Sequence, residues 1–85
     1  MNTPDIRHAL RTYIASAIRT SALADDTDIF EAGLVNSMFA MQILLFIEKT
    51  FALTVGNDEL DLANFRSVDA MTAFVERKLA VGAAA

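Results

Sequence analysis

Residues 28–51 read DIFEAGLVNSMFAMQILLFIEKTF, and this stretch predicts a loop followed directly by a helix. The loop prediction extends over residues 21–36, where several aspartates precede Gly33 and disfavour a helix. From Asn36 or Ser37 to about Phe51, apolar residues recur at helical spacing. Asn36 has a side chain that caps helices well. A loop of this length is unusual in a small domain and is often functional.

The predicted helix at 37–51 is apolar on more than one face. One row of apolar residues consists of Ile43, Ile47 and Phe51, which we expect to face the core. A second row on a neighbouring face consists of Met38, Met41 and Leu45. Such a helix is either nearly surrounded by other elements, or it leaves one apolar face available for a partner.

The flanking segments predict two further helices and one short element. Thr3 is a candidate N-cap for a first amphipathic helix over about 4–20. Apolar residues at 60–65 suggest a short irregular or helical segment, and Ser67 is placed to cap a last helix. Its expected buried residues are Val68, Met71, Phe74, Val75 and Leu79. No segment alternates at strand period, so we expect an all-α bundle of three main helices plus one short helix.

Length and composition predict one globular domain. The chain has 85 residues, of which 54% are hydrophobic and 21% charged, so it is too apolar for a disordered chain. We expect a single domain over 1–85, ordered over about 4–80, with a frayed tail at 81–85. The chain has no cysteine, which excludes disulfides and thiolate metal sites.

Charge and hydropathy narrow the classes of partner. The formal net charge of −4 disfavours nucleic acid and favours partners with basic docking patches. The longest apolar run, from Ile43 to Ile47, is too short to span a membrane. The N-terminus shows no signal-peptide pattern. We therefore expect a soluble, cytoplasmic protein without a membrane partner.

Conventional catalytic and metal sites have little support in the sequence. His8 is the only histidine and is remote in sequence from any serine in a suitable setting, so we expect a surface role for it. The aspartates at 25, 26 and 28 do not fit a calcium loop, because the fifth position is Ile29 or Phe30 rather than an oxygen ligand. A solvated, turn-forming loop is the better interpretation, and we expect no metal site.

Ser37 is the serine with the most distinctive setting. It follows a loop that contains glycine and opens a predicted helix, where the helix dipole tolerates an attached phosphate. Considered alone, these local features favour a simpler role, in which Ser37 only helps to cap the helix.

The segment Asp28-Ile29-Phe30-Glu31-Ala32-Gly33-Leu34-Val35-Asn36-Ser37-Met38 resembles the signature of acyl carrier proteins. In that family an aspartate, a phenylalanine and a glycine precede an Asp-Ser-Leu or similar triplet. The resemblance extends over about 6–79 and includes the order of helices. It implies that Ser37 receives 4′-phosphopantetheine, that Phe30 and Gly33 shape the loop beside it, and that the protein is not itself an enzyme. Partner enzymes would contact the second helix through Met38, Met41, Gln42, Leu45 and Glu48.

Two features depart from the family pattern. Asn36 stands where aspartate is usual, which keeps a capping side chain but removes its charge. The second helix is also less acidic than in fatty-acid carriers, with Phe39, Met41 and Leu45 apolar and Lys49 basic. We therefore expect recognition that is more hydrophobic and less sensitive to salt.

The resemblance implies a freestanding, monomeric carrier of acyl or aminoacyl groups in polyketide or related specialised metabolism. Its partners would be a phosphopantetheinyl transferase, a loading acyltransferase or adenylating ligase, and a downstream synthase or tailoring enzyme. Two alternatives stay open. An unmodified helical interaction module would dock through its second helix, and a small hydrolase would depend on Ser37 and His8.

Overall fold

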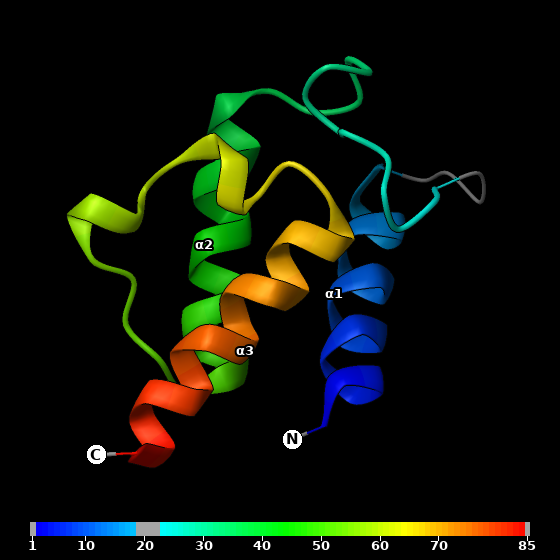
Figure 1. Ribbon diagram of the computed structural model, residues 1–85. Helices are drawn as coiled ribbons and strands as arrows, with labels where there is room; N and C mark the ends of the chain where they lie inside the picture. The colour runs from blue at the N-terminus through cyan, green and yellow to red at the C-terminus, as the bar shows by residue number, and fades with distance from the viewer. Residues whose placement is uncertain (1, 19–22, 85) are drawn as a thin grey trace.

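The structure is a computed structural model that describes residues 2–18 and 23–84, without the side chains of residues 37 and 81–84. It contains three helices: α1 (Thr3–Ile18), α2 (Ser37–Phe51) and α3 (Val68–Ala84). Two 3-10 turns, η1 (Asn57–Glu59) and η2 (Leu62–Asn64), lie between α2 and α3 (Figure 1). The predicted all-α bundle is confirmed, and the second helix has the predicted bounds.

The ends of α1 and α3 differ from the predicted ends. α1 starts at Thr3 because the Asn2 side chain caps it, with Oδ1 accepting a hydrogen bond of 3.0 Å from Asp5 N. Thr3, the predicted cap, instead donates its hydroxyl to Glu76 of α3. The predicted end of the first helix at residue 20 lies outside the described residues. α3 extends past residue 80, where we expected order to end, and continues to Ala84.

The core is formed by one apolar face from each helix. Every residue of the predicted α2 core row, Ile43, Ile47 and Phe51, is buried. Other buried apolar side chains of the same cluster are Ile6, Leu10 and Ile14 of α1, and Val68, Met71, Phe74 and Val75 of α3. This cluster also contains Leu23 and Ile29, so the loop between α1 and α2 is attached to the core by apolar side chains.

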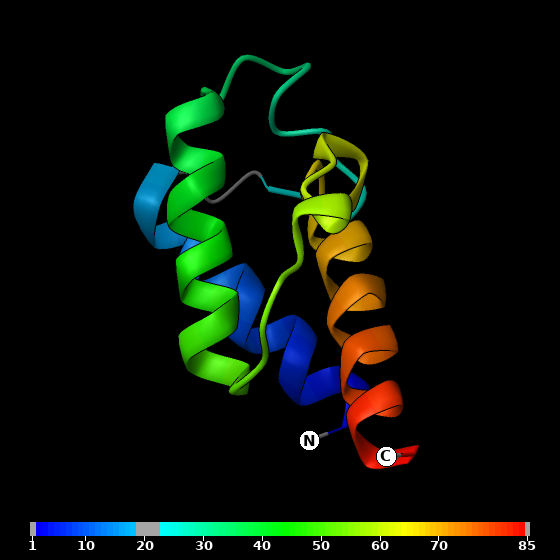
Figure 2. The same ribbon diagram turned by 90° about the vertical axis from the view of Figure 1, so that its left-hand side faces the viewer.

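The α2–α3 connection forms two separate 3-10 turns instead of the single short helix that we expected. Each turn is capped by a local carboxylate: Glu59 Oε1 accepts from Gly56 N at 2.9 Å, and Asp61 Oδ1 accepts from Ala63 N at 2.9 Å. Leu60, between them, has a ψ of 67°, which is not helical. Acidic side chains that bond to nearby backbone groups favour such turns over a continuous helix. Figure 2 shows the connection rising between α2 and α3.

The contact between Glu59 and Lys78 should make stability depend on pH in the acid range. Lys78 Nζ lies 2.8 Å from Glu59 Oε1, and this bond, with the bond from Gly56 N, lowers the pKa of Glu59. The pKa of Glu59 in the folded protein is below its unfolded value of about 4.3. The stabilisation that the ionised Glu59 gives to the folded state is therefore complete at neutral pH. It is lost as pH falls from that value through the lowered folded pKa.

We therefore expect Glu59→Gln to remove part of the acid-induced loss of stability below about pH 5. The measurement is the midpoint of thermal unfolding as a function of pH. Glu31→Gln is a matched control, because Glu31 is exposed and forms no ion pair with any residue that the structure describes. Identical pH profiles for the two variants would contradict a role for the Glu59–Lys78 contact.

Candidate functional site

The loop before α2 is shaped by a tight turn that begins at Asp28. Asp28 Oδ1 accepts hydrogen bonds from Phe30 N at 3.1 Å and from Glu31 N at 2.9 Å. Gly33 has a φ of +75°, in the left-handed region that favours glycine. A Cβ at this position would meet nothing within 4 Å, so the backbone conformation and not space requires glycine. The predicted turn-forming role of the loop is confirmed.

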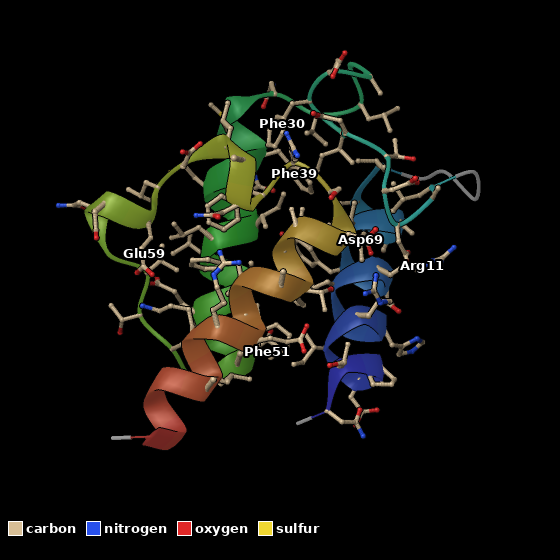
Figure 3. The ribbon with its side chains drawn as sticks, in the orientation of Figure 1. Arg11, Phe30, Phe39, Phe51, Glu59 and Asp69 are labelled. Atoms are coloured by element: carbon tan, nitrogen blue, oxygen red, sulfur yellow. The ribbon has the colours of Figure 1, made fainter. Side chains whose placement is uncertain are left out.

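Ile29 fastens this turn to the core. Its side chain is fully buried, and its backbone N donates to Arg66 O at 2.8 Å, just before α3. Its carbonyl oxygen accepts from Leu34 N at 3.0 Å, which closes the turn. Phe30 is half-buried against the core cluster, at the end of the bundle where α2 begins (Figure 3). The position of the chain just before α2 is therefore set by packing and by backbone bonds.

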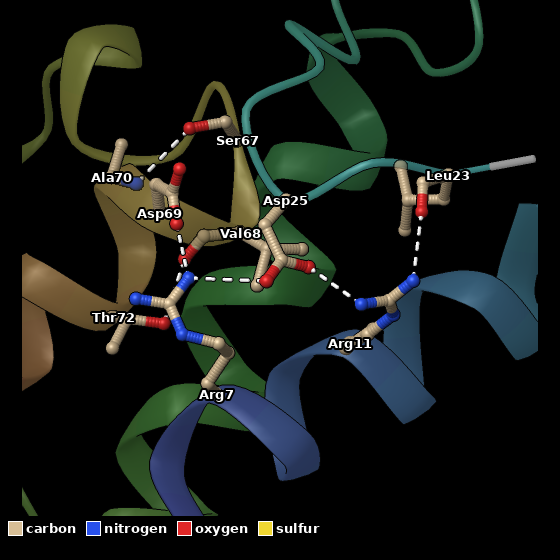
Figure 4. A network of polar contacts seen from close by, with 9 residues as sticks. All are labelled: Arg7, Arg11, Leu23, Asp25, Ser67, Val68, Asp69, Ala70 and Thr72. Atoms are coloured by element: carbon tan, nitrogen blue, oxygen red, sulfur yellow. Dashed lines mark hydrogen bonds and ion pairs between the residues drawn. The ribbon is translucent and has the colours of Figure 1, made fainter. Parts of the chain in front are cut away.

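Ion pairs hold the start of the same loop to α1 and α3 (Figure 4). Arg7 and Arg11 of α1 contact the two carboxylate oxygens of Asp25, at 3.2 and 3.1 Å. Arg7 also pairs with Asp69, and Arg11 donates to Leu23 O at 3.2 Å. The bonds to Asp69 and Asp25 raise the pKa of Arg7. The backbone oxygen of Asp25 also accepts from Asp69 N of α3 at 2.9 Å, so Asp25 contacts both α1 and α3, a role that the sequence did not reveal.

Ser37 is the first residue of α2, directly after this anchored loop. Asn36 caps the helix: its Oδ1 accepts from Phe39 N at 3.1 Å, and its backbone is extended, as at an N-cap. The first turn of α2 contains no acidic residue. The predicted cap at Asn36 is confirmed, and the helix begins at Ser37, one of the two predicted starts. An anion attached at this position would meet the positive end of the helix without a repelling carboxylate in the same turn.

The second apolar row of α2 is exposed. Met38 is 72% exposed, Leu45 60% and Met41 53%, and Gln42 is exposed beside them. Such a row of large apolar side chains is typical of an interaction surface. The structure therefore brings four of the five predicted partner-contacting residues together on one open face, which starts at Met38, directly after Ser37.

Two other α2 side chains have different surroundings. Glu48 is half-buried, and its Oε2 accepts a hydrogen bond of 2.8 Å from Val55 N. The Glu48 carboxylate thus fixes the position of the chain at Val55, and only its other oxygen remains available to a partner. Phe39 is also half-buried, with its ring stacked on Tyr13 of α1 at a centroid distance of 6.1 Å. Tyr13 lies still closer to Phe46, at 4.0 Å, so these rings join α1 to α2.

A groove of about 180 Å³ adjoins the exposed face. α2 contributes Ala40, Met41 and Leu44 to its lining, and the connection contributes Leu60, Asp61 and Leu62. Leu60 and Leu62 are about half exposed, at 48% and 52%. The sequence suggested only that this segment is short. The alternation of apolar and acidic residues at Leu60, Asp61 and Leu62 could have indicated an exposed apolar surface that also carries a negative charge.

The chain matches the family model for the phosphopantetheine attachment site over residues 8–75, which is well over half of its length. The chain belongs to this family, that of the acyl carrier proteins. The match spans α2 and the whole loop before it. No curated protein matches the chain significantly.

Members of this family bear 4′-phosphopantetheine covalently on a serine, and carrier domains are not themselves catalytic. The start of α2 in this carrier domain fits such a group, because a neutral cap at Asn36 precedes a serine at the helix N-terminus. When attached, the arm supplies the terminal thiol that a chain without cysteine lacks.

Other candidate chemistry has less support in the fold. His8 is exposed on α1, on the rim of an open hollow between α1 and Phe46. Within residues 2–18 and 23–84, no three acidic or histidine side chains converge as metal ligands would. In the same part of the chain, no helix is long and apolar enough to cross a membrane.

Proposed function

We propose that Ser37 is the residue of this carrier domain that is modified, and that the arm on it carries an acyl or aminoacyl group as a thioester. One observation carries this proposal: Ser37 opens α2 directly after the anchored turn, next to the neutral cap Asn36. The domain would pass its cargo between enzymes of polyketide or related specialised-metabolite biosynthesis.

The modification is a transfer from coenzyme A. The Ser37 oxygen forms a bond to the phosphorus next to the pantetheine, and the bond from that phosphorus to the departing nucleotide breaks. Adenosine 3′,5′-bisphosphate leaves, and the hydroxyl proton passes to a base of the transferase. The product is a phosphodiester with one negative charge, which the N-terminus of α2 stabilises.

A flexible arm explains how one small domain serves several enzymes. Once the domain docks, the arm raises the effective concentration of cargo at the active site of its partner. The loading enzyme, whether an acyltransferase or an adenylating ligase, and the later synthase must each bind and leave quickly. Weak, reversible docking therefore suits this function. Methionine side chains such as Met38 and Met41 adapt to different partner surfaces.

A charge on the exposed face should weaken recognition by the phosphopantetheinyl transferase without unfolding the domain. We expect Leu45→Glu to raise KM for the carrier in the transferase reaction, because a carboxylate would be desolvated at an apolar contact. The midpoint of thermal unfolding should change little, since the Leu45 side chain is largely exposed. Thr50→Glu, on an exposed polar position of the same helix, is the control. If Leu45→Glu unfolds the domain, this face belongs to the core.

The direct experiment is the intact mass of the protein after incubation with coenzyme A and a broad-specificity phosphopantetheinyl transferase. The proposal predicts the gain of one phosphopantetheinyl group. No gain with several such transferases would favour the alternative of an unmodified interaction module. That alternative has the exposed apolar row of α2 in its support.

A further inference from the structure

The groove between α2 and the α2–α3 connection combines apolar walls with one acidic group. Met41, Leu60 and Leu62 form exposed apolar walls. Asp61 lies in the same lining and is exposed. Its Oδ1 accepts from Ala63 N, and it forms no ion pair with any residue that the structure describes. Asp61 can therefore attract a basic side chain.

α2 contributes no acidic side chain to the lining of the groove. Its only acidic residue is Glu48, and one oxygen of that carboxylate already bonds to Val55 N. The neighbouring Lys49 is exposed and positive, so it would repel a basic partner. A partner with a basic docking patch would therefore find its complementary charge on the connection, at Asp61, rather than on α2.

The groove also lies within reach of any enzyme that acts on Ser37. Ala40 and Leu44 follow Ser37 by three and seven residues, which places them about 4.5 and 10.5 Å along the helix axis. Met41 and Leu44 have the spacing of one helical row that starts at position 37. A standard interface buries about 800 Å² per partner, a disc of roughly 16 Å radius. An interface of this size centred on Ser37 would extend over the groove.

We propose that the phosphopantetheinyl transferase docks across this groove, with an apolar side chain between Met41 and Leu62 and a basic side chain on Asp61. The inference rests on the proposed modification of Ser37. The α2–α3 connection would then form part of the surface that the transferase contacts. Asp61 would supply the charge, and α2 would supply apolar contacts.

The test measures kcat and KM for the carrier in the transferase reaction at low and high salt. Asp61→Asn keeps the Oδ1 acceptor that caps η2 but removes the charge. We expect a KM about two- to fivefold higher at low salt, the range that one exposed ion pair supports. At about 1 M salt, where the screening length is roughly 3 Å, the difference should vanish. The turnover number kcat should not change, because Asp61 does not take part in the transfer.

Two further variants distinguish charge from apolar contact. Asp58→Asn makes the same change at an exposed acid of η1 that does not line the groove, so KM should remain that of the wild type. Leu62→Ala removes an apolar wall and should raise KM at both salt concentrations. Thermal unfolding of each variant shows whether the fold is intact.

The outcomes separate this inference from the proposed function. If the wild type is modified normally but Asp61→Asn and Leu62→Ala leave KM unchanged, the groove is not part of the docking surface. Equal effects of Asp58→Asn and Asp61→Asn would also overturn the inference, since only net charge would then matter. Absence of modification in the wild type would overturn the proposed function as well.

Discussion

Ser37→Ala should abolish attachment of the phosphopantetheinyl group and leave the fold intact. Alanine has no oxygen to accept the group, and it is a good residue for the first position of a helix. The cap of α2 does not depend on this residue, because Asn36 Oδ1 accepts the bond from Phe39 N. Intact mass should show no addition, and the free energy of unfolding should change by less than about 0.5 kcal/mol.

A second serine provides the matched control for this experiment. Ser67 is buried, and its Oγ accepts a hydrogen bond of 3.0 Å from Ala70 N at the start of α3. Ser67→Ala should cost about 1 kcal/mol of stability through the lost cap but should still be modified. Ser37→Ala should therefore lose the added mass and keep its stability, whereas Ser67→Ala should gain the mass and lose stability. Modification of the Ser37→Ala protein would refute the assignment of the site.

Ile47→Ala should cause the largest loss of stability. Ile47 is fully buried in the middle of α2, where its side chain joins the common core. Removing its outer carbons should cost about 2–5 kcal/mol through lost burial and the cavity that remains. That is a large share of the roughly 5–15 kcal/mol that holds a small domain folded. The measurement is the free energy of unfolding from denaturant titration.

Leu45→Ala is the control for Ile47→Ala, because it also truncates a large apolar side chain, two residues away on the same helix. Leu45 is 60% exposed, so its truncation should cost much less stability. Similar losses for the two variants would mean that both faces of α2 are buried. The assignment of one face to the core and the other to partners would then fail.

The sequence predicted α2 well because several local signals agree there. Asn36 caps the helix, and the core row of Ile43, Ile47 and Phe51 recurs at helical spacing. The neighbouring face carries further apolar residues that are not needed to fill the core, which indicates a contact surface. The turn before α2 could also be predicted. An aspartate such as Asp28 accepts hydrogen bonds from nearby backbone N–H groups, and a glycine such as Gly33 adopts a positive φ without strain. Family resemblance then singled out Ser37 from the other serines.

Contacts between distant segments could not be predicted in the same way. The pairing of Arg7 and Arg11 with Asp25 depends on how the loop crosses α1, and helical spacing carries no information about that. Similarly, the family resemblance placed Glu48 on the partner face, whereas the fold brings Val55 N to its carboxylate. The connection formed two turns because of side-chain bonds from Glu59 and Asp61, which compete locally with a helix.

The location of the added group within the chain tests the central claim most directly. Cleavage after glutamate releases residues 32–48, a peptide in which Ser37 is the only hydroxyl-bearing residue. The other serines lie in two other peptides of this digest, 1–31 and 60–76. Mass spectrometry of the modified protein should show the phosphopantetheinyl mass on peptide 32–48 alone. The same mass on peptide 1–31 or 60–76, with 32–48 unmodified, would contradict the assignment of Ser37.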